Sequence, residues 1–297
     1  MIKIVLVGSG GSVPSLNRAM PCLALKYDKL FLFDIGEGTQ RELIRTNLPF
    51  GSVNSIFISH LHLDHFLGVY GLLETLRLNN FKGKVRIFAP KGFRLIKKFD
   101  FVEITPIEND GKLFSHRDFE VFAFRTNHEK DSFGFKVKFR DKLVFIKDKL
   151  KELELERLPG IMFKKLLEKK KILIDDKEIK LEDVTKIKRS FSMVYTADTQ
   201  YCENVIYNSK EVDLLIHEAT YLSKDKELAL ERKHSTIEDA LKAFSESKAK
   251  KLVLTHISTR YKENEIIEDI NKLSEKFEIN KDTIQIGKDG LTWYYKF

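Results

Sequence analysis

The sequence predicts an α/β layered domain, and three observations support that prediction. Apolar runs rich in β-branched and aromatic residues alternate with segments of helical periodicity, so strands and helices interleave along the chain. The 297 residues, 42% hydrophobic and 32% charged, suffice for one enzyme-sized core. The chain has no run of about 18 uncharged apolar residues, so we predict no membrane span and no membrane partner.

The expected strands are short apolar runs bounded by polar or turn residues. In chain order they lie at 2–7, 22–27, 30–34, 55–59, 85–88, 119–125, 133–139, 191–196, 213–217, 252–255 and 291–296. Helical spacing of apolar residues predicts helices at about 37–46, 64–78, 235–248 and 263–276. Because the chain opens directly on the strand IKIVLVG without a signal-peptide pattern, we expect a cytoplasmic protein.

One segment, from about 147 to 189, departs from this alternation. It is charged and helical at first and then turns to short β-like pieces before the strand FSMVYTAD. Nine Lys or Arg against five Asp or Glu at 147–171 make it locally basic. We interpret it as an insertion in a single domain spanning 1–297, with a solvated helical hairpin as the open alternative.

The net charge indicates which class of partner to expect, and the number and spacing of cysteines indicate which side chains can bind a metal. A formal net charge of +8 favours a polyanionic partner, although lysines that only promote solubility explain the same balance. Cys22 and Cys202 lie far apart and form no C-x-x-C pair. Any metal must therefore be held by histidine and carboxylate.

The motif SHLHLDH at 59–65 gives the strongest chemical signal. It lies between an expected strand and an expected helix. The strand end places His60 and His62 on one side, and the helix start turns Asp64 and His65 toward the same cavity. Imidazole and carboxylate are the ligands that Zn²⁺ accepts when thiolate is absent. A hydrogen-bonded polar loop is the alternative interpretation.

Further polar residues follow the ends of other expected strands. His128 follows FEVFAF, Asp198 follows FSMVYTA, His217 follows VDLLI, and His256 follows KLVLT. Layered α/β folds assemble sites at one edge of their sheets, so we expect these side chains to meet there. His116, in the charged stretch SHRDF, is expected at the surface.

Asp34 ends the strand KLFLFD and leads into IGEGTQ, whose glycines allow a tight turn into a helix. By itself it is compatible with a helix N-cap. Beside a metal it would instead accept a hydrogen bond from a ligating histidine and fix the tautomer of that ring.

Together these residues resemble the five motifs of the metallo-β-lactamase superfamily over nearly the whole chain. The resemblance implies an αββα four-layer sandwich with an inserted flexible arm and two Zn²⁺ ions per subunit. It implies the following metal ligands: His60, His62 and His128 on one ion, Asp64, His65 and His256 on the other, and Asp198 between them. Asp34 and His217 would support the ligands from behind without binding metal.

Finer motifs resemble the short-form RNase Z family, namely LFDIGEGTQRELI at 32–44, LLIHEATY at 214–221, KHSTIEDA at 233–240 and LTHISTRY at 254–261. This implies a zinc-dependent endoribonuclease that removes the 3′ trailer from precursor tRNA and leaves a 3′-hydroxyl. Asp64 would be the general base, and the pair Glu218 and His234 would protonate the departing 3′ oxygen. Arg260 and Arg18 would contact substrate phosphate.

The insertion at about 147–183 is placed like the flexible arm of that family, which reaches across a homodimer to the tRNA elbow. The resemblance thus implies a homodimer and an arm that contacts tRNA through four lysines: Lys164, Lys165, Lys169 and Lys170.

Two stretches depart from the family pattern. The arm has Ile161 after Gly160 in place of the glycine-proline signature. The loop PSLNRA at 14–19 lacks the lysine and asparagine of the family's P-x-K-x-R-N loop. The arm conformation and the treatment of CCA-bearing precursors are therefore not carried over.

Two other functions compete with this interpretation. A small-molecule phosphodiesterase or arylsulfatase-like metallohydrolase would use the same metal pair, but the basic insertion disfavours it. A non-catalytic nucleic-acid-binding protein is disfavoured because every expected ligand is present. A dinucleotide-binding interpretation of GSGGSV at 8–13 is weaker still, since Val13 stands where the third glycine belongs.

Overall fold

The computed structural model describes residues 1–174 and 177–296. The chain forms two compact units, one made of Met1–Lys138 with Phe191–Phe297 and the other of Phe139–Ser190. The larger unit is built on two seven-stranded sheets. Two separate two-stranded sheets are formed by strands of the smaller unit.

The first large sheet combines antiparallel and parallel pairing. Its strands are β18 (Leu291–Tyr295), β1 (Ile2–Gly8), β2 (Cys22–Lys26), β3 (Leu30–Phe33), β4 (Val53–Phe57), β5 (Val85–Pro90) and β6 (Val102–Ile107), in that spatial order. Pairing is antiparallel from β18 to β3 and parallel from β3 to β6. Its helices are α1 (Thr39–Arg45), α2 (Leu63–Phe66) and α3 (Gly68–Leu78). Parallel strands bring their carboxyl ends to one edge, where the polar side chains of the site gather.

The second large sheet has the spatial order β17 (Ile284–Ile286), β16 (Leu252–Thr255), β15 (Leu214–Glu218), β14 (Ser192–Tyr195), β9 (Phe133–Phe139), β8 (Phe119–Arg125) and β7 (Gly111–Ser115). Strands β14 to β17 are parallel to one another. The helices of this half are α7 (Glu203–Ser209), α8 (Lys226–Glu231), α9 (Ile237–Ser247) and α10 (Glu263–Lys276). Short 3-10 turns in the larger unit lie at Phe50–Ser52, Ser223–Asp225 and Lys281–Thr283.

Strand β3 is buried on both faces: one face packs against helices and the other against the second sheet. Leu30 and Leu32 belong to the buried cluster that includes residues of α1 and α3. Phe31 and Phe33 point the other way, and the Phe33 ring lies 5.7 Å from that of Phe135 in the second sheet. This alternation is the period-two geometry of a strand buried on both faces.

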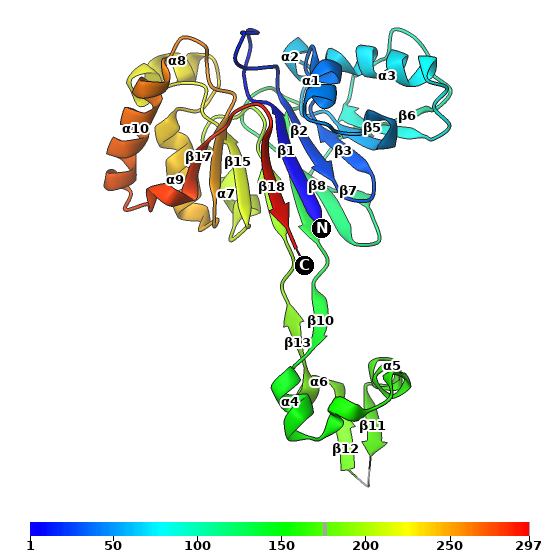
Figure 1. Cartoon of the computed structure of the whole chain (residues 1–297). Coiled ribbons are helices and arrows are strands. Elements are labelled where there is room, and N and C mark those ends of the chain that lie inside the picture. Colours follow the sequence, from blue (N-terminus) through cyan, green and yellow to red (C-terminus); the bar gives the residue numbers. More distant parts are fainter. Residues whose placement is uncertain (175–176, 297) are drawn as a thin grey trace. The chain divides into compact units, whose positions relative to one another are not determined.

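The larger unit is therefore a four-layer αββα sandwich. Helices α1 to α3 lie outside the first sheet, and α9 and α10, in orange, lie outside the second (Figure 1). A second buried cluster joins α9 and α10 to strands β14 to β16. The order of layers agrees with the fold that the metallo-β-lactamase resemblance implies.

The predicted elements agree with the structure to different degrees. The helix expected at 263–276 has those bounds, whereas the one expected at 64–78 is divided into α2 and α3. Gly68 begins α3, where a Cβ would lie 2.1 Å from the Gly36 carbonyl oxygen, so the chain passes close to the strand-end loop there. Strands β6, β7 and β17 were missed because they lie at sheet edges and have weaker apolar patterns.

The smaller unit has its own minor core. It contains β10 (Lys142–Phe145), α4 (Lys147–Glu152), a 3-10 turn at Leu155–Arg157, α5 (Gly160–Lys169), β11 (Lys171–Ile174), β12 (Lys177–Lys180), α6 (Leu181–Val184) and β13 (Thr185–Lys188). Its buried residues are Leu155, Leu166, Ile179, Leu181 and Val184. The insertion expected at about 147–183 lies within this unit, except that residues 175 and 176 fall outside the described ones.

Within 1–174 and 177–296 no helix is long and apolar enough to cross a membrane.

Candidate metal centre

Strand ends of both large sheets deliver the polar side chains of the site. Asp34 follows β3, Asp198 lies three residues beyond β14, and His256 follows β16. Asp34 and His256 adopt left-handed backbone conformations (φ 54° and 57°), as does Ala197 just before Asp198 (φ 52°). Such conformations are uncommon for residues other than glycine and cluster at functional sites. Here they turn the chain sharply at the point where each polar side chain leaves its strand.

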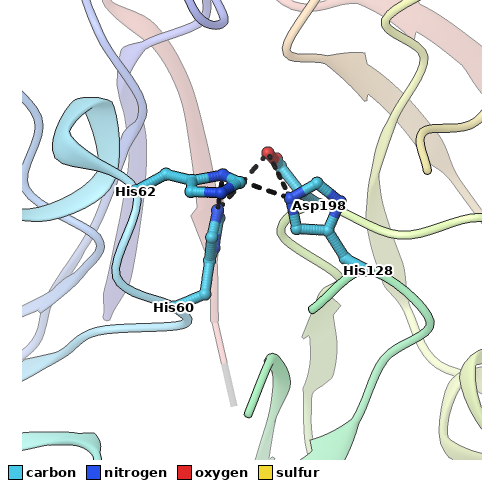
Figure 2. Close-up of side chains that lie close together, drawn as sticks. All are labelled: His60, His62, His128 and Asp198. Atoms are coloured by element: carbon cyan, nitrogen blue, oxygen red, sulfur yellow. Dashed lines mark hydrogen bonds and ion pairs between the residues drawn. The ribbon is translucent and has the colours of Figure 1, made fainter. Parts of the chain in front are cut away.

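Three imidazole nitrogens converge in the first half of the centre. His60 Nε2 lies 3.1 Å from His62 Nδ1, which lies 3.2 Å from His128 Nε2. Asp198 Oδ2 lies 3.6 Å from His60 Nε2 and 3.9 Å from His128 Nε2. Figure 2 shows these four side chains pointing toward one another. Ligands of a tetrahedral ion with bonds of about 2.1 Å are about 3.4 Å apart, so the spacing fits a shared metal.

The second half lies on the other side of Asp198. Asp64 Oδ2 lies 3.6 Å from both His65 Nε2 and His256 Nε2. The two oxygens of Asp198 divide between these rings, with Oδ2 3.3 Å from His65 Nε2 and Oδ1 3.3 Å from His256 Nε2. Asp198 thus contacts both triads, as expected of a carboxylate between two ions.

Each buried imidazole is fixed from behind through Nδ1. The acceptors are Ser59 Oγ for His60 (2.9 Å), Asp34 Oδ2 for His65 (2.8 Å), the Lys233 carbonyl for His128 (2.8 Å) and Thr220 Oγ1 for His256 (2.8 Å). A proton on Nδ1 leaves the lone pair of Nε2 directed into the cavity. These are the outer partners that metal-binding histidines typically have.

Three polar atoms of the centre are buried without a hydrogen bond to any described residue: His65 Nε2, His256 Nε2 and Asp198 Oδ1. Buried polar atoms are nearly always paired, so three such atoms facing one space need an explanation. A divalent cation supplies it, because imidazole and carboxylate are its usual ligands. The residues present therefore fit a metal centre.

The electrostatics of the protein alone favour a cation. Burial lowers the pKa of His60 well below its ordinary value, so that ring is neutral and able to bind metal. Burial also acts against a charged His65, but Asp198 and Asp34 outweigh it and raise the pKa of His65. Burial opposes ionisation of Asp198, yet His256 and His65 hold the pKa of Asp198 well below its usual range. Carboxylates that stabilise a protonated ring would equally stabilise a metal ion.

Asp34 connects the two sheets behind the second triad. Its carboxylate accepts hydrogen bonds from the backbone N–H (2.8 Å) and hydroxyl (2.9 Å) of Ser59, and from the Tyr195 hydroxyl (2.9 Å), besides His65. Asp34 and Tyr195 are both buried and belong to different sheets. Asp34 thus lies behind His65, on the side of the ring away from the other groups of the second triad.

Glu218 holds His234 beside the metal centre. Glu218 Oε1 lies 2.9 Å from His234 Nδ1, and the carboxylate also accepts backbone N–H groups of Thr199 and Ser235. Burial lowers the pKa of His234, but Glu218 and Asp198 outweigh this and raise it to about 9. In the absence of metal the imidazole is therefore protonated at neutral pH, with the Nε2 edge left for other contacts.

Comparison with known proteins decides the family. The chain is 38% identical over 294 residues to ribonuclease Z of Thermococcus sibiricus, covering 95% of each chain. It belongs to the ribonuclease Z family. Ribonuclease Z of Pyrococcus abyssi is 37% identical, over 99% of this chain and 98% of that one. The resemblance inferred from the motifs is thus confirmed.

Solved structures confirm the metallo-β-lactamase fold. The metallo-beta-lactamase fold protein YhfI from Bacillus subtilis superposes with a TM-score of 0.73 over 98% of both chains, at 18% identity. The short form of human tRNase Z gives a TM-score of 0.67 over 99% of this chain and 100% of that chain, at 23% identity. Sequence models of two families match parts of the chain: the anti-Pycsar protein Apyc1 at 2–96 and the beta-lactamase superfamily domain at 184–257.

The other residues expected of a ribonuclease Z site lie in different settings. His217 is fully buried, and its Nδ1 contacts the Glu218 carbonyl at 2.6 Å, outside the three groups of possible metal ligands found among the described residues. Arg260 is exposed and lies over the Tyr221 ring at 5.2 Å. The half-buried Arg18 donates to Ser9 Oγ (2.9 Å) and to the Gly287 carbonyl (2.6 Å).

The four arm lysines are exposed, and they lie on or directly after α5. Lys169 and Lys170 line a hollow of about 670 Å³ together with Lys171 and Lys180. Clustered ammonium groups of this kind attract polyanions.

Several supporting residues of the ribonuclease Z site were not identified from the sequence, chiefly Ser59, Tyr195 and Thr220. Each hydroxyl contacts a metal-facing histidine or the carboxylate behind one. Ser59 and Thr220 lie inside the motifs SHLHLDH and LLIHEATY, and Tyr195 ends the strand before Asp198. Proximity to those motifs is the only sequence signal that points to them.

Proposed function

We propose that this chain is an endoribonuclease that removes the 3′ trailer from precursor tRNA and leaves a 3′-hydroxyl on the tRNA. Membership in the ribonuclease Z family supports this activity. The structural observation that carries it is the pair of triads with Asp198 between them, within 3.9 Å of rings in both. Two adjacent cations are the usual means of hydrolysing a phosphodiester in line.

The proposed cofactor is a pair of zinc ions per subunit. His60, His62 and His128 would hold one ion, Asp64, His65 and His256 the other, and Asp198 would contact both. Nitrogen and oxygen ligands at this spacing suit zinc, which tolerates mixed sets without thiolate. When bound, such ions supply positive charge to the phosphoryl oxygens and acidify water.

Asp64 is the proposed general base. Its Oδ2 accepts a hydrogen bond of 2.9 Å from the Ser12 backbone N–H and faces His65 and His256. Burial acts against the ionised form, but the neighbouring histidines outweigh it and lower the pKa of Asp64. The carboxylate is therefore ionised at neutral pH, and the Ser12 N–H holds its Oδ2 beside His65 and His256.

His234 is the proposed general acid, with Glu218 as its positioning partner. Because Glu218 holds Nδ1, the proton on Nε2 is the one available to the departing 3′ oxygen. Alkoxide oxygens leave poorly without a proton, so this transfer matters most for RNA.

Phosphate contacts are assigned to the two arginines. Arg260 lies over Tyr221, whose ring is 6.0 Å from that of His234, which supports a place beside the reacting phosphate. Arg18 lines a hollow of about 300 Å³ with Ser258 and Lys288, where a neighbouring phosphate would fit. Part of its guanidinium is already used by Ser9 and Gly287, so Arg18 would contribute less than Arg260.

The smaller unit is the proposed tRNA-binding arm of a homodimer. The exposed lysines on and after α5 support an electrostatic contact with the tRNA backbone. The arm would act on tRNA bound by the partner subunit, as the family resemblance implies.

The test is incubation of purified protein with end-labelled precursor tRNA, with and without chelator, beside bis(p-nitrophenyl) phosphate. We expect trailer removal that chelation abolishes and that zinc restores. Metal analysis should give two zinc ions per chain, and sedimentation should give a dimer. Turnover of the small diester with intact precursor tRNA would overturn the tRNA assignment and favour a small-molecule phosphodiesterase.

A further inference from the structure

The side chain of Asp289, near the C-terminus, binds both ends of the N-terminal loop of residues 9–19. Asp289 is not one of the proposed metal ligands. Asp289 Oδ1 accepts hydrogen bonds from the backbone N–H (2.9 Å) and the hydroxyl (2.7 Å) of Ser9. Asp289 Oδ2 accepts the backbone N–H of Ala19 at 2.6 Å. One side chain thus fastens both ends of the loop, and Asp289 itself belongs to neither triad of the metal centre.

The loop that Asp289 closes contacts the second triad through its backbone. The Ser9 carbonyl accepts the His256 backbone N–H at 3.0 Å, and the Ser12 N–H donates to Asp64 Oδ2 at 2.9 Å. Gly11 lies against the His256 ring, where an added Cβ would come within 2.3 Å of Nδ1. Ser12 itself adopts a left-handed conformation with φ 60°, which an unrestrained loop would seldom keep.

Asp64 and His256 are not fixed equally by other groups. The His256 ring is held at Nδ1 by Thr220 Oγ1. The His256 backbone is left-handed, and its amide N–H donates to the Ser9 carbonyl. The Ser12 N–H is the one hydrogen bond found for the Asp64 carboxylate in the described part of the chain. The shape of the loop therefore decides where the Asp64 carboxylate points.

We propose that Asp289 is a positioning residue for the reaction, which sets Asp64 and His256 by fixing both ends of the loop 9–19. Among the proposed metal ligands, we expect the effect in the second triad, because no hydrogen bond joins His60, His62 or His128 to this loop within the described residues. Since Asp64 is the proposed general base and metal ligand, the inference rests on the proposed function.

The chain offers a matched control in Asp269. Its Oδ2 accepts the backbone N–H (2.8 Å) and the hydroxyl (2.9 Å) of Ser223, which reproduces the clasp between Asp289 and Ser9. Asp269 lies in α10, is half-buried like Asp289, and contacts no residue of either triad. Replacing either carboxylate by the amide removes the same kind of interaction.

The experiment compares Asp289→Asn with Asp269→Asn, measuring Tm, kcat and KM on precursor tRNA, and zinc affinity of chelator-treated protein against a chromophoric competitor. For Asp289→Asn we expect kcat to fall and the zinc dissociation constant of the second triad to rise, each about tenfold, since groups that orient metal ligands typically contribute that much. The other zinc site, formed by His60, His62 and His128, should keep its parental affinity. Asp269→Asn should lower Tm comparably and leave kcat and both zinc affinities unchanged.

Equal effects of the two variants on kcat and zinc affinity, or an Asp289→Asn variant that matches the parent in both, would overturn the proposal. If Asp289→Asn does not fold, Ser9→Ala decides, because it removes one hydroxyl and keeps both backbone donors. Ser9→Ala removes the bonds of the hydroxyl to Asp289 and Arg18 and leaves the two backbone donors to Asp289 in place. We expect it to weaken the second zinc site about threefold, less than Asp289→Asn does; no change would refute the clasp. Failure of the parent to cleave precursor tRNA would instead refute the proposed function, and the zinc measurements would still test Asp289.

Discussion

The metal centre at the strand ends of the two large sheets and the inserted unit Phe139–Ser190 differ in how far their charged side chains are buried and fixed by neighbours. At the metal centre, Asp198 is buried and lies within 3.9 Å of five imidazoles, and each of those rings has a second partner. In the inserted unit the lysines of α5 are exposed above a small apolar core. Buried, over-determined groups suit chemistry that needs fixed geometry, whereas exposed charges suit a partner of variable shape.

The largest effect should follow from removing the carboxylate that both triads share. We expect Asp198→Ala to lower kcat/KM on precursor tRNA and on bis(p-nitrophenyl) phosphate by at least about 10⁴-fold. The reason is that two cations supply several kcal/mol of charge stabilisation, and about 1.4 kcal/mol corresponds to a factor of ten. Steady-state kinetics and metal analysis measure the loss.

Asp213→Ala is the control for Asp198→Ala. Asp213 accepts the Ser192 backbone N–H at 2.8 Å at the start of β14, the strand whose other end leads to Asp198. The control should lose stability but bind metal and turn over substrate like the parent. Near-parental activity of Asp198→Ala would remove the basis for a shared metal pair.

A smaller and substrate-dependent effect is expected at His234. We expect His234→Ala to lower kcat on precursor tRNA by about 10²- to 10³-fold, as for loss of a general acid. Bis(p-nitrophenyl) phosphate releases p-nitrophenolate, which needs no proton, so its turnover should fall by less than about tenfold. Rates on the two substrates, measured side by side, give the ratio.

The same pair of substrates tests the competing role of His234. Asp198, His234 and His256 also form a group close enough to share an ion. An equal loss on both substrates would indicate that His234 binds metal, because a metal ligand serves both leaving groups alike. His116→Ala, outside the site, controls for removal of a histidine.

Substitutions in the inserted unit should change the affinity for precursor tRNA and leave the rate of phosphodiester hydrolysis unchanged. We expect replacement of four lysines by alanine to weaken precursor tRNA binding by about 10- to 100-fold and to reduce the slope of log K against log salt by about 3 to 4, as each lost phosphate contact predicts. The lysines are Lys164, Lys165, Lys169 and Lys170. Turnover of bis(p-nitrophenyl) phosphate should stay at the parental rate.

A matched set of lysines keeps the change in net charge the same. Lys210, Lys248, Lys250 and Lys251 are exposed and lie near the starts of β15 and β16, at the ends of those strands opposite to His256. Their replacement should alter tRNA affinity far less. If both sets weakened binding equally, the arm would have no special role and only the total charge would matter.

The contrast between the two regions also explains what the sequence could and could not predict. Central strands such as β3 and β15 are buried on both faces and appear as continuous apolar runs, so the polar residues at their ends stand out. That is why the sequence alone predicts Asp34 and His256 at one edge. Edge strands such as β6, whose pattern is mostly exposed, give no comparable signal.

Outer partners of the site were beyond prediction for a different reason. A hydroxyl that accepts a hydrogen bond from a distant imidazole needs no fixed spacing in sequence, as the separation of 36 positions between Thr220 and His256 illustrates. Asp289 is 280 positions from Ser9, and only folding brings them together. Sequence patterns thus identify ligands, while the groups that orient those ligands come from the structure.

Substitution of Tyr195 should have the smallest effect of those considered at the metal centre, because its hydroxyl reaches His65 only through Asp34. Burial, reinforced by Asp34, raises the pKa of Tyr195 well above its ordinary value, so the group remains a donor across the working pH range. Asp34 keeps His65 and both donors of Ser59 when this hydroxyl is removed. We therefore expect Tyr195→Phe to lower kcat by only about threefold to tenfold, below the usual loss of an outer partner of a metal ligand.

Tyr295→Phe is the matched control, since the Tyr295 hydroxyl is buried and makes no hydrogen bond among the described residues. Thermal unfolding and kcat should separate the two variants. Tyr195→Phe should lose stability, because a hydrogen bond to a charged acceptor contributes about 1.5–3 kcal/mol, whereas Tyr295→Phe should be neutral. A Tyr195→Phe enzyme with parental kcat would show that Ser59 alone fixes Asp34, and that the contact between the two sheets stabilises the fold without orienting His65.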